Sequence, residues 1–390
     1  MQSRFSIYPE DANESLEFDK ICDLLDQQCL GALGRKALSS NHFSYQKDEL
    51  NFVLRQVLEM KFGLENNLKF PAQNYHDLSI ELKSLSIINN VIEGKQFRKI
   101  LDSAKTVENI SLFFKKYPDQ FKTLRKNIEL ISIDPRIPNS IDKVIDEEGE
   151  VRSDASPALV KIRKEINSKS KAIHIVFGRI LTNLKNESKL AETQESIRNG
   201  RRVLALQAES KRSINGIIHD ESDSGKTSYI EPQETVLLNN ELFELEREEK
   251  REVYRILKTL SATIAEAIPL LNNYQELLAS YDLIRSKAIV ARLMNGNMPI
   301  IGDDGNVQYF NAYHPLLLIK NKSLRKETIP FDVALNKNKG ILLISGPNAG
   351  GKSVALKAMG LMQLMLQFGL LIPCDENSKV ILFEQIFADL

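Results

Sequence analysis

The sequence predicts a mainly helical protein with a C-terminal α/β part. Apolar residues recur every three or four positions over most of residues 15–294, which is the pattern of helices that bury one face. Between about Ser196 and Pro232 the pattern changes to short apolar runs separated by Asn-Gly and Asp-Ser-Gly turns, which predicts a small inserted antiparallel sheet. After residue 298, strand-like runs surround a glycine-rich loop that opens a helix, and this alternation is typical of α/β structure.

Composition limits the classes of protein that fit. A chain of 390 residues has room for two or three domains, and its 52 basic and 52 acidic side chains give zero net charge. Any contact with nucleic acid must therefore come from local patches. The N-terminus has no apolar export signal, and no stretch reaches the ~20 apolar residues of a membrane span. We expect a cytoplasmic protein without membrane contact.

The three cysteines, Cys22, Cys29 and Cys374, form no C-x-x-C pair. Core packing in a reducing cytosol is favoured over a disulfide or a metal site.

Residues 1–150 are predicted to form a helical core. Helical spacing runs from Ser15 to about Asn67, and a further helix opens at His76-Asp77-Leu78, with an apolar face that we extend to Ile92. The pair His76 and Asp77 is open to two interpretations. It could be an acid–base pair, but an aspartate at a helix entry beside a surface histidine is favoured.

Residues 151–235 are predicted to form a clamp-like insertion made of a helix and the small sheet. Ser156-Pro157 has the pattern of an N-cap followed by proline at the first helical position, and the helix extends to Leu184. Basic side chains flank the sheet: Arg198, Arg201, Arg202, Lys211, Arg212 and Lys226. They could lie on a phosphate backbone or form an ordinary solvated rim. His219-Asp220-Glu221 could suggest a metal site, but three adjacent residues of an extended segment cannot all face one ion.

Residues 236–297 are predicted to form long lever helices. Pro269 requires a kink or a break, yet some 60 helical residues would span on the order of 80–90 Å. Such a length suits a lever that carries movement, although a stabilising helical hairpin is the alternative.

Residues 298–390 are predicted to be the α/β part. We expect strands within Met298–Ile319, at Ile329–Leu335, at Ile341–Ser345 and at Val380–Ala388, with a helix from Val354 to Leu371. The loop after the third strand has the pattern G-x-x-x-x-G-K-[ST]. It consists of Gly346, Pro347, Asn348, Ala349, Gly350, Gly351, Lys352 and Ser353.

The chemistry of this loop explains its spacing. Glycines let successive backbone N–H groups point at one anion, and the helix that begins there adds the positive end of its dipole. Lys352 would neutralise the β and γ phosphates, and the Ser353 hydroxyl would bind Mg²⁺. The sequence therefore predicts a site for ATP or ADP with Mg²⁺. The alternative, an ordinary glycine-rich turn, is disfavoured.

Several motifs together resemble the MutS family of DNA-repair ATPases, most closely its bacterial type-two branch, which lacks the mismatch-reading N-terminal domain. The motifs are Leu16-Glu17-Phe18-Asp19-Lys20-Ile21, Gly216-Ile217-Ile218-His219-Asp220, Tyr229-Ile230-Glu231-Pro232 with Asn239-Asn240, Asn311-Ala312-Tyr313-His314-Pro315-Leu316-Leu317, the glycine-rich loop and Ile386-Phe387-Ala388-Asp389.

The resemblance implies a helical core and lever, a clamp, and the N-terminal part of an ABC-type ATPase domain from near residue 298. It implies that His314 and the neighbourhood of Ile329 border the adenine. It also implies a homodimer that holds branched or double-stranded DNA and acts in DNA repair or suppression of recombination, or on stalled ribosomes. Arg201, Arg202, Lys211 and Arg212 are the candidate DNA contacts.

One departure from the family pattern bears on activity. The acidic strand-end residue, the water-orienting carboxylate and the signature helix would lie beyond Leu390, as would a nuclease module. We therefore expect a truncated chain that binds nucleotide without hydrolysing it, from a parent protein that is an ATPase. Glu384 resembles the acidic residue but is interpreted as a plain strand residue. The alternative function is a nucleic-acid or ribosome clamp with a non-functional nucleotide loop.

Overall fold

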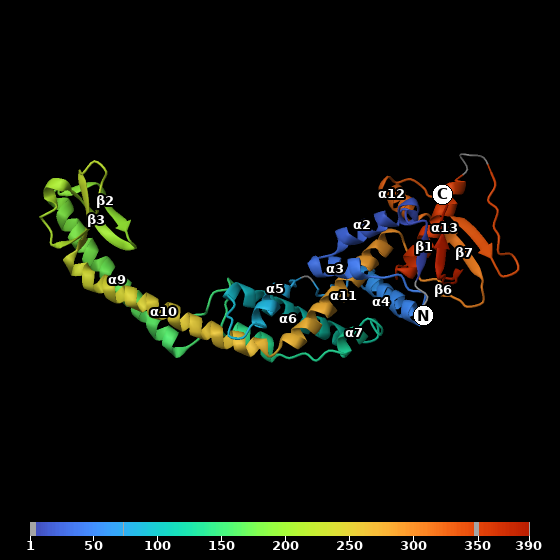
Figure 1. Cartoon of the computed structure of the whole chain (residues 1–390), viewed down its shortest axis with the longest axis horizontal. Helices are drawn as coiled ribbons and strands as arrows, with labels where there is room; N and C mark the ends of the chain where they lie inside the picture. The colour runs from blue at the N-terminus through green and yellow to red at the C-terminus, as the bar shows by residue number, and fades with distance from the viewer. Residues whose placement is uncertain (1–4, 73, 347–350, 390) are drawn as a thin grey trace. The chain divides into compact units, whose positions relative to one another are not determined.

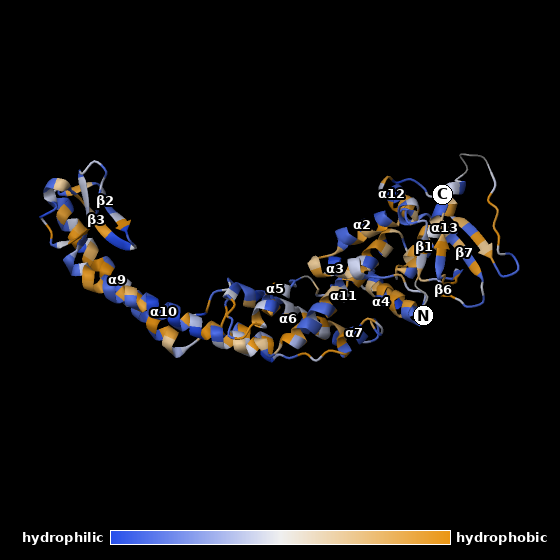
Figure 2. Ribbon diagram, viewed as in Figure 1, coloured by the Kyte–Doolittle hydropathy of each residue, from blue (hydrophilic) through white to orange (hydrophobic). Residues whose placement is uncertain are grey.

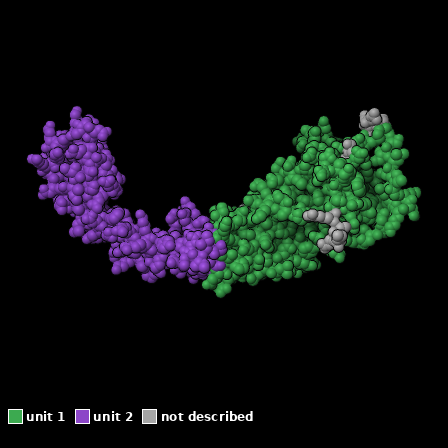
Figure 3. Space-filling view, in the orientation of Figure 1, with its two compact units in different colours: residues 1–83, 99–138, 266–390 green, residues 84–98, 139–265 purple. Residues whose placement is uncertain are grey.

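The computed structural model describes residues 5–72, 74–346 and 351–389. The chain forms two compact units, each built from separate segments (Figure 3). The first unit contains residues 1–83, 99–138 and 266–390, and the second contains residues 84–98 and 139–265. The fold is mainly helical with small sheets, as the sequence predicts (Figure 1). No described helix is long and apolar enough to cross a membrane.

Helix α11 (Ile268–Leu293) is the central element of the first unit. Its side chains are buried on nearly every face, as expected of a helix inside a core, and many of its residues are apolar (Figure 2). Helices α2 (Phe18–Gln28), α3 (Ala32–Ser40) and α4 (Lys47–Glu65) pack against it. The short helices α1 (Ala12–Ser15) and α7 (Lys126–Glu129) belong to the same unit. The ring centroids of Tyr281 of α11 and Phe70 are 5.3 Å apart, so aromatic side chains form part of the core.

Asp282 of α11 fixes the start of α3. Its carboxylate accepts hydrogen bonds from the backbone N–H of Leu30 at 2.9 Å and of Gly31 at 3.3 Å, and from the hydroxyl of Tyr75. These N–H groups precede a helix that has no capping side chain of its own. A Cβ at Gly34 would lie 1.9 Å from the carboxylate, so the close approach requires glycine.

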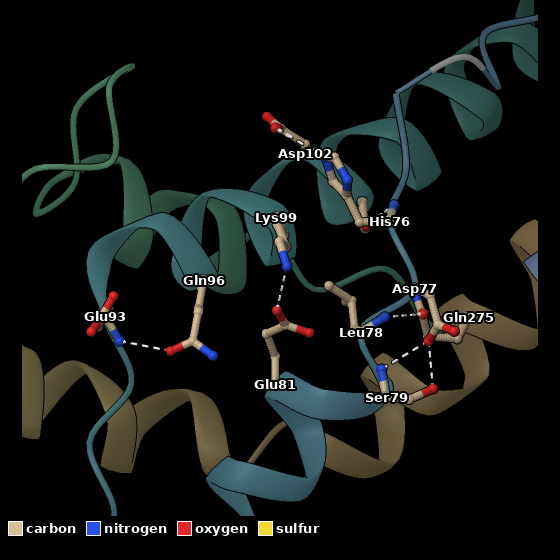
Figure 4. A network of polar contacts seen from close by, with 11 residues as sticks. His76, Asp77, Leu78, Ser79, Glu81, Glu93, Gln96, Lys99, Asp102 and Gln275 are labelled. Carbon is tan, nitrogen blue, oxygen red and sulfur yellow. Dashed lines mark hydrogen bonds and ion pairs between the residues drawn. The ribbon is translucent and has the colours of Figure 1, made fainter. Parts of the chain in front are cut away.

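The region after His76 confirms one interpretation and corrects another (Figure 4). Asp77 accepts a hydrogen bond from the backbone N–H of Ser79 at 2.9 Å, where α5 (Ser79–Leu85) begins, whereas His76 lies 3.7 Å from Asp102. Asp77 is thus the predicted helix-entry residue rather than half of an acid–base pair. The predicted apolar face is wrong beyond Leu85, because the helix ends there and Ile88 is 89% exposed. Helices α6 (Gly94–Lys116) and α8 (Arg136–Asp142) follow.

The C-terminal part of the first unit contains a four-stranded sheet in the order β6-β9-β7-β8. The strands are Ile300–Ile301, Lys379–Val380, Val307–Ala312 and Phe331–Leu335. A second, parallel pair joins β1 (Ser6–Tyr8) to β10 (Gln385–Phe387). The sequence did not predict β1. Because β1 pairs with β10, residues near the beginning of the chain lie against its C-terminal part as well as in the helical core.

Two predicted strands of this part are wrong. The apolar run after His314 forms helix α12 (Pro315–Ser323), because His314 has extended N-cap geometry and Pro315 supplies the first helical φ angle. Residues 341–345 form no strand, and Ile341 and Leu343 are 92% and 88% exposed. A strand needs a neighbour for its backbone groups, and the described sheet contains none for this segment.

The second unit is built on two long antiparallel helices, α9 (Pro157–Asn186) and α10 (Gln233–Ala265). Ser156 caps α9 by accepting from the backbone N–H of Leu159 at 3.1 Å, as predicted. Ion pairs join the basic helix α9 to the acidic helix α10: Arg163 with Glu249, Lys169 with Glu241 and Arg179 with Glu234. The predicted long helical stretch breaks before Pro269, so α10 and α11 are separate helices.

The predicted inserted sheet is present in the second unit, with the order β2-β3-β5-β4 and antiparallel pairing throughout. Its strands are Leu190–Arg198, Arg201–Gln207, Thr227–Pro232 and Gly216–Glu221, with the short helix η1 (Ala208–Ser210) between β3 and β4. Leu204, Leu206 and Ile230 pack against Phe177, Ile180 and Leu184 of α9. One face of the sheet is thus buried on the helix.

Candidate nucleotide site

The described residues of the glycine-rich loop fit a phosphate group. Gly346 and Gly351 have φ angles of +153° and +79°, a region that favours glycine, and added Cβ atoms would meet no described residue within 4 Å. Conformation rather than packing therefore requires glycine at both positions. Pro347, Asn348, Ala349 and Gly350 lie outside the described residues.

Helix α13 (Lys352–Gln367) begins directly after Gly351, and its first turn carries no acidic side chain. Lys352 donates from its ammonium group to the carbonyl oxygen of Gly346, so it reaches across the loop. Ser353 is exposed in the same turn. An anion at this point would meet the first backbone N–H groups of α13, the positive end of the helix dipole and an ammonium group.

Two buried glutamines hold the segment after the sheet against α13. The Gln363 side-chain amide donates to the carbonyl of Ile381 at 3.0 Å, and that of Gln367 donates to the carbonyl of Phe383 at 2.8 Å. Phe383 returns a backbone N–H to the Gln367 side chain at 3.1 Å. Side chains of α13 thus satisfy the carbonyl of Ile381 and both backbone groups of Phe383. Glu384 lies outside both β9 and β10 and is exposed, so its interpretation as a strand residue is wrong.

His314, one of the two residues that the resemblance assigns to the adenine side, is 7% exposed at the start of α12. Its Nε2 lies 3.7 Å from a carboxylate oxygen of Glu17, and its Nδ1 is buried with no hydrogen-bond partner among the described residues. Burial lowers the pKa of the imidazole, and the charge of Lys357 on α13 adds to this effect. The burial of His314 and its unpartnered Nδ1 are compatible with a packing role and with a contact to a ligand.

The second adenine-side residue, Ile329, is 85% exposed in the segment before β8. Sequence reasoning missed Glu17, which accepts from Lys20 and faces His314 from the other end of the chain. The hydrogen bond from Lys20 is the main cause that lowers the Glu17 pKa. The motif Leu16–Ile21 was the signal that could have found it.

The candidate DNA contacts fall into two groups. Arg201 donates to the carboxylate of Glu231 at 2.9 and 3.0 Å, and Arg202 pairs with Glu195 at 2.6 Å and lies over the ring of Phe177. Both guanidinium groups are thus held within the unit. Lys211 makes a 3.6 Å pair with the exposed Glu221. Arg212 and Lys226 are exposed, and the structure records no ion pair for either within the described chain.

Glu231 is the centre of a polar cluster that sequence reasoning did not assemble. Its carboxylate is fully buried and accepts from Arg201, from Asn239 at 2.7 Å and from His219 at 2.7 Å. Burial opposes ionisation of Glu231, but the hydrogen bonds from Asn239, His219 and Arg201 outweigh it and lower the pKa. The residues come from three separated stretches, β3, β4 and the β5–α10 junction. The cluster therefore fixes the sheet to the start of α10.

The cysteines and the acidic run near His219 show ordinary packing. Cys29 and Cys374 are buried, Cys22 is partly buried, and all three are unpaired thiols. His219 faces Glu231, whereas the adjacent Asp220 pairs with Arg198. Within the described residues, no group of three metal-ligating side chains is arranged around a common point.

Comparison with known proteins identifies close matches. The family model for MutS domain V matches residues 342–390. Proteins named Endonuclease MutS2 match from Alkaliphilus metalliredigens, 30% identical over 96% of this chain and 47% of the relative, and from Halothermothrix orenii, 32% identical over 98% and 48%. The protein of the same name from Clostridium kluyveri is 40% identical over 63% of this chain and 30% of its own length. The chain spans about half the length of these curated relatives. The predicted resemblance is thus confirmed: nearly the whole chain is similar to the type-two branch of the MutS family.

Proposed function

We propose that the chain binds ATP or ADP through the loop at residues 346–353. The observation that carries the proposal is the pairing of two glycines at positive φ with the start of α13, where Lys352 and Ser353 stand in the first turn. Lys352 would hold the β and γ phosphates, and the hydroxyl of Ser353 would bind Mg²⁺. The ion, when bound, neutralises phosphate charge. His314 and Ile329 are proposed to border the adenine.

We further propose that nucleotide binding serves a role in DNA repair or suppression of recombination. The similarity to proteins named Endonuclease MutS2 supports DNA as the partner. On this proposal, residues 1–150 are the core, 151–235 the clamp, 236–297 the lever and 298–390 the nucleotide-binding part. DNA lies against the clamp in a homodimer.

A second candidate is a clamp that acts on nucleic acid or ribosomes without using nucleotide. The observation that favours it is the exposed segment 341–345, because a phosphate loop ordinarily follows a strand that is held in a sheet. The two candidates differ in whether the loop binds phosphate at all.

Titration of labelled ATP with Mg²⁺ into the wild type and Lys352→Ala separates the two candidates. Loss of the ammonium group should weaken binding at least tenfold, since a charge-assisted contact to phosphate disappears. The matched control is Lys379→Ala, which removes an exposed lysine from β9 of the same unit. Equal affinity of the wild type and Lys352→Ala would overturn the nucleotide proposal and favour the clamp.

A further inference from the structure

Lys287 of α11 is a buried lysine whose ammonium group lies at the C-terminal end of α13. Its side chain is 2% exposed, and its Nζ donates to the carbonyl oxygen of Phe368 at 2.7 Å. Nζ also lies 5.1 Å from the centre of the Phe368 ring. Within the described part of the chain, no carboxylate acts on the pKa of this ammonium group. The ionisable group that does act on it is the thiol of Cys22.

This arrangement is unfavourable for stability alone. Burial of an ammonium group without a carboxylate disfavours its charged form, and the pKa of Lys287 falls to about 7. Gly369 follows Phe368 directly, with a φ of +80° that favours glycine, and a Cβ there would lie 2.8 Å from the Val53 side chain and 3.1 Å from Nζ. A methionine would fill the same space without a charge. The lysine is therefore better explained by what it contacts than by packing.

Lys287 contacts the C-terminal end of α13, the helix that begins at the glycine-rich loop. Phe368 is the C-cap residue of α13, and its carbonyl also accepts from the side-chain amide of Asn41 at 3.1 Å. The preceding carbonyl, of Gln367, accepts from the backbone N–H of Ser44 at 2.8 Å. A cation at a helix C-terminus stabilises the negative end of the dipole. Lys287 is the member of this set that belongs to α11.

Helix α11 is in turn tied to the helical core around Lys287. The hydroxyl of Ser286 donates to the carbonyl of Leu25 at 2.8 Å, and Arg285 donates to the carbonyl of Gln28 at 3.1 Å. Asp282, one turn earlier, caps α3. A helix of 16 residues is about 24 Å long, so α13 joins the loop at one end to this fastened stretch of α11 at the other.

We propose that Lys287 is a positioning residue that couples occupancy of the loop at the start of α13 to helix α11. The proposal rests on the proposed nucleotide binding at residues 346–353. Phosphates at the N-terminus and the ammonium group at the C-terminus act on the two ends of one helix. A shift of α13 on binding changes the contact between Lys287 and Phe368, and α11 responds because Lys287 is part of it.

Hydrogen exchange read by mass spectrometry tests the coupling, with and without saturating Mg-ADP. Nucleotide should slow exchange in the first turn of α13 and in residues 280–293 of α11 in the wild type. In Lys287→Met the response of α11 should fall at least threefold while that of the α13 first turn persists. The matched control is Lys61→Met, which removes another buried lysine, 8% exposed, that donates to a backbone carbonyl, that of Gly296, at 2.9 Å.

The outcomes separate the two proposals. Nucleotide binding by calorimetry with an equal α11 response in the wild type and Lys287→Met overturns the coupling alone, as does an equal loss in Lys61→Met. Absence of binding by the wild type overturns the proposed function and the coupling with it. If Lys287→Met does not fold, Lys287→Gln serves as the second variant, since its shorter side chain keeps a polar group but should not reach Phe368, and the same threefold loss is expected.

Discussion

Because Lys287 is buried, the free energy of unfolding depends on pH and rises toward alkaline pH. Its pKa is about 7 in the folded chain and near 10.5 in the unfolded chain. Between these values the unfolded chain holds one more proton, so stability rises as pH rises from about 7 toward 10. The pKa of the nearby Cys22 thiol is raised by burial from 9.0 to about 11, so this thiol acts in the opposite direction only above about pH 9.

We therefore predict that Lys287→Met raises the urea midpoint at pH 6.5 and removes the rise that the wild type shows between pH 7 and pH 9. The gain at pH 6.5 should amount to a few kcal/mol, because an unpaired buried charge is replaced by an apolar side chain of similar volume. Far-UV circular dichroism gives the measurement, since the chain has no tryptophan. Parallel pH profiles for the two proteins would contradict the assignment of the effect to Lys287.

Glu231 gives a prediction of the same sign with respect to pH, but in the acid range. Because its pKa is lowered on folding, its contribution to stability is present above pH 4.5 and is lost as pH falls through the folded pKa. Glu231→Gln should destabilise the second unit by about 2–4 kcal/mol, since Arg201 and His219 lose their charged acceptor. Thermal unfolding at pH 7 measures this. The control, Glu195→Gln, removes a more exposed partner of an arginine and should change stability by less than 1 kcal/mol.

At the residue scale, sequence reasoning found the chemical types but not their partners. It singled out Tyr229–Pro232 with Asn239-Asn240 as motifs, yet only the fold shows that Glu231 and Asn239 meet Arg201 and His219. The sequence suggests Arg201 as a DNA contact because it is one of several basic residues that flank the sheet. A basic residue in a sequence does not reveal that a buried carboxylate already holds it.

At the scale of elements, helix starts were the most predictable feature because they depend on neighbouring residues. Ser156-Pro157 and Pro269 were interpreted correctly for that reason. Apolar runs without such signals were ambiguous. Leu316–Ile319 suggested a strand and forms a helix, and Ile341–Ser345 suggested a buried strand and is exposed, because a strand depends on distant neighbours that no local pattern specifies.

The N-cap of α9 supplies the prediction that belongs to this scale. Ser156→Ala should destabilise the second unit by about 1 kcal/mol, because the N–H of Leu159 loses its acceptor and Glu252 loses a donor at 2.7 Å. Chemical denaturation followed by circular dichroism measures the change. Ser168→Ala, an exposed substitution in the middle of the same helix, should be neutral or slightly stabilising. An equal effect of both substitutions would show that helix propensity rather than capping determines the change.

At the scale of the whole molecule, the order of the chain does not give the order of the units. The second unit is inserted between segments of the first, and β1 pairs with β10 from the opposite end of the sequence. Neither arrangement has a local signal, since both depend on contacts between residues far apart along the chain. The ion pairs between basic side chains of α9 and acidic side chains of α10 likewise join residues far apart along the chain.

Basic side chains that are not held in ion pairs are the best placed to contact a phosphate backbone. The test for DNA binding therefore uses two such residues. Arg212 and Lys226 are exposed in the connections on either side of β4 and have no ion pair recorded in the described chain. We predict that Arg212→Ser with Lys226→Ser weakens binding of double-stranded DNA and lowers the slope of log K against log[salt] by about 1–2, because each contact with a phosphate releases about one counterion.

Fluorescence anisotropy between 50 and 200 mM salt measures affinity and slope together. Lys115→Ser with Lys116→Ser is the matched control, because it removes two exposed lysines from the last turn of α6 in the other unit. If the control pair lowers the slope equally, binding is a general response to charge and the clamp is not its site. If neither pair changes the slope, the DNA lies elsewhere. If only the clamp pair lowers it, the sheet supplies phosphate contacts while Arg201 and Arg202 hold the sheet together.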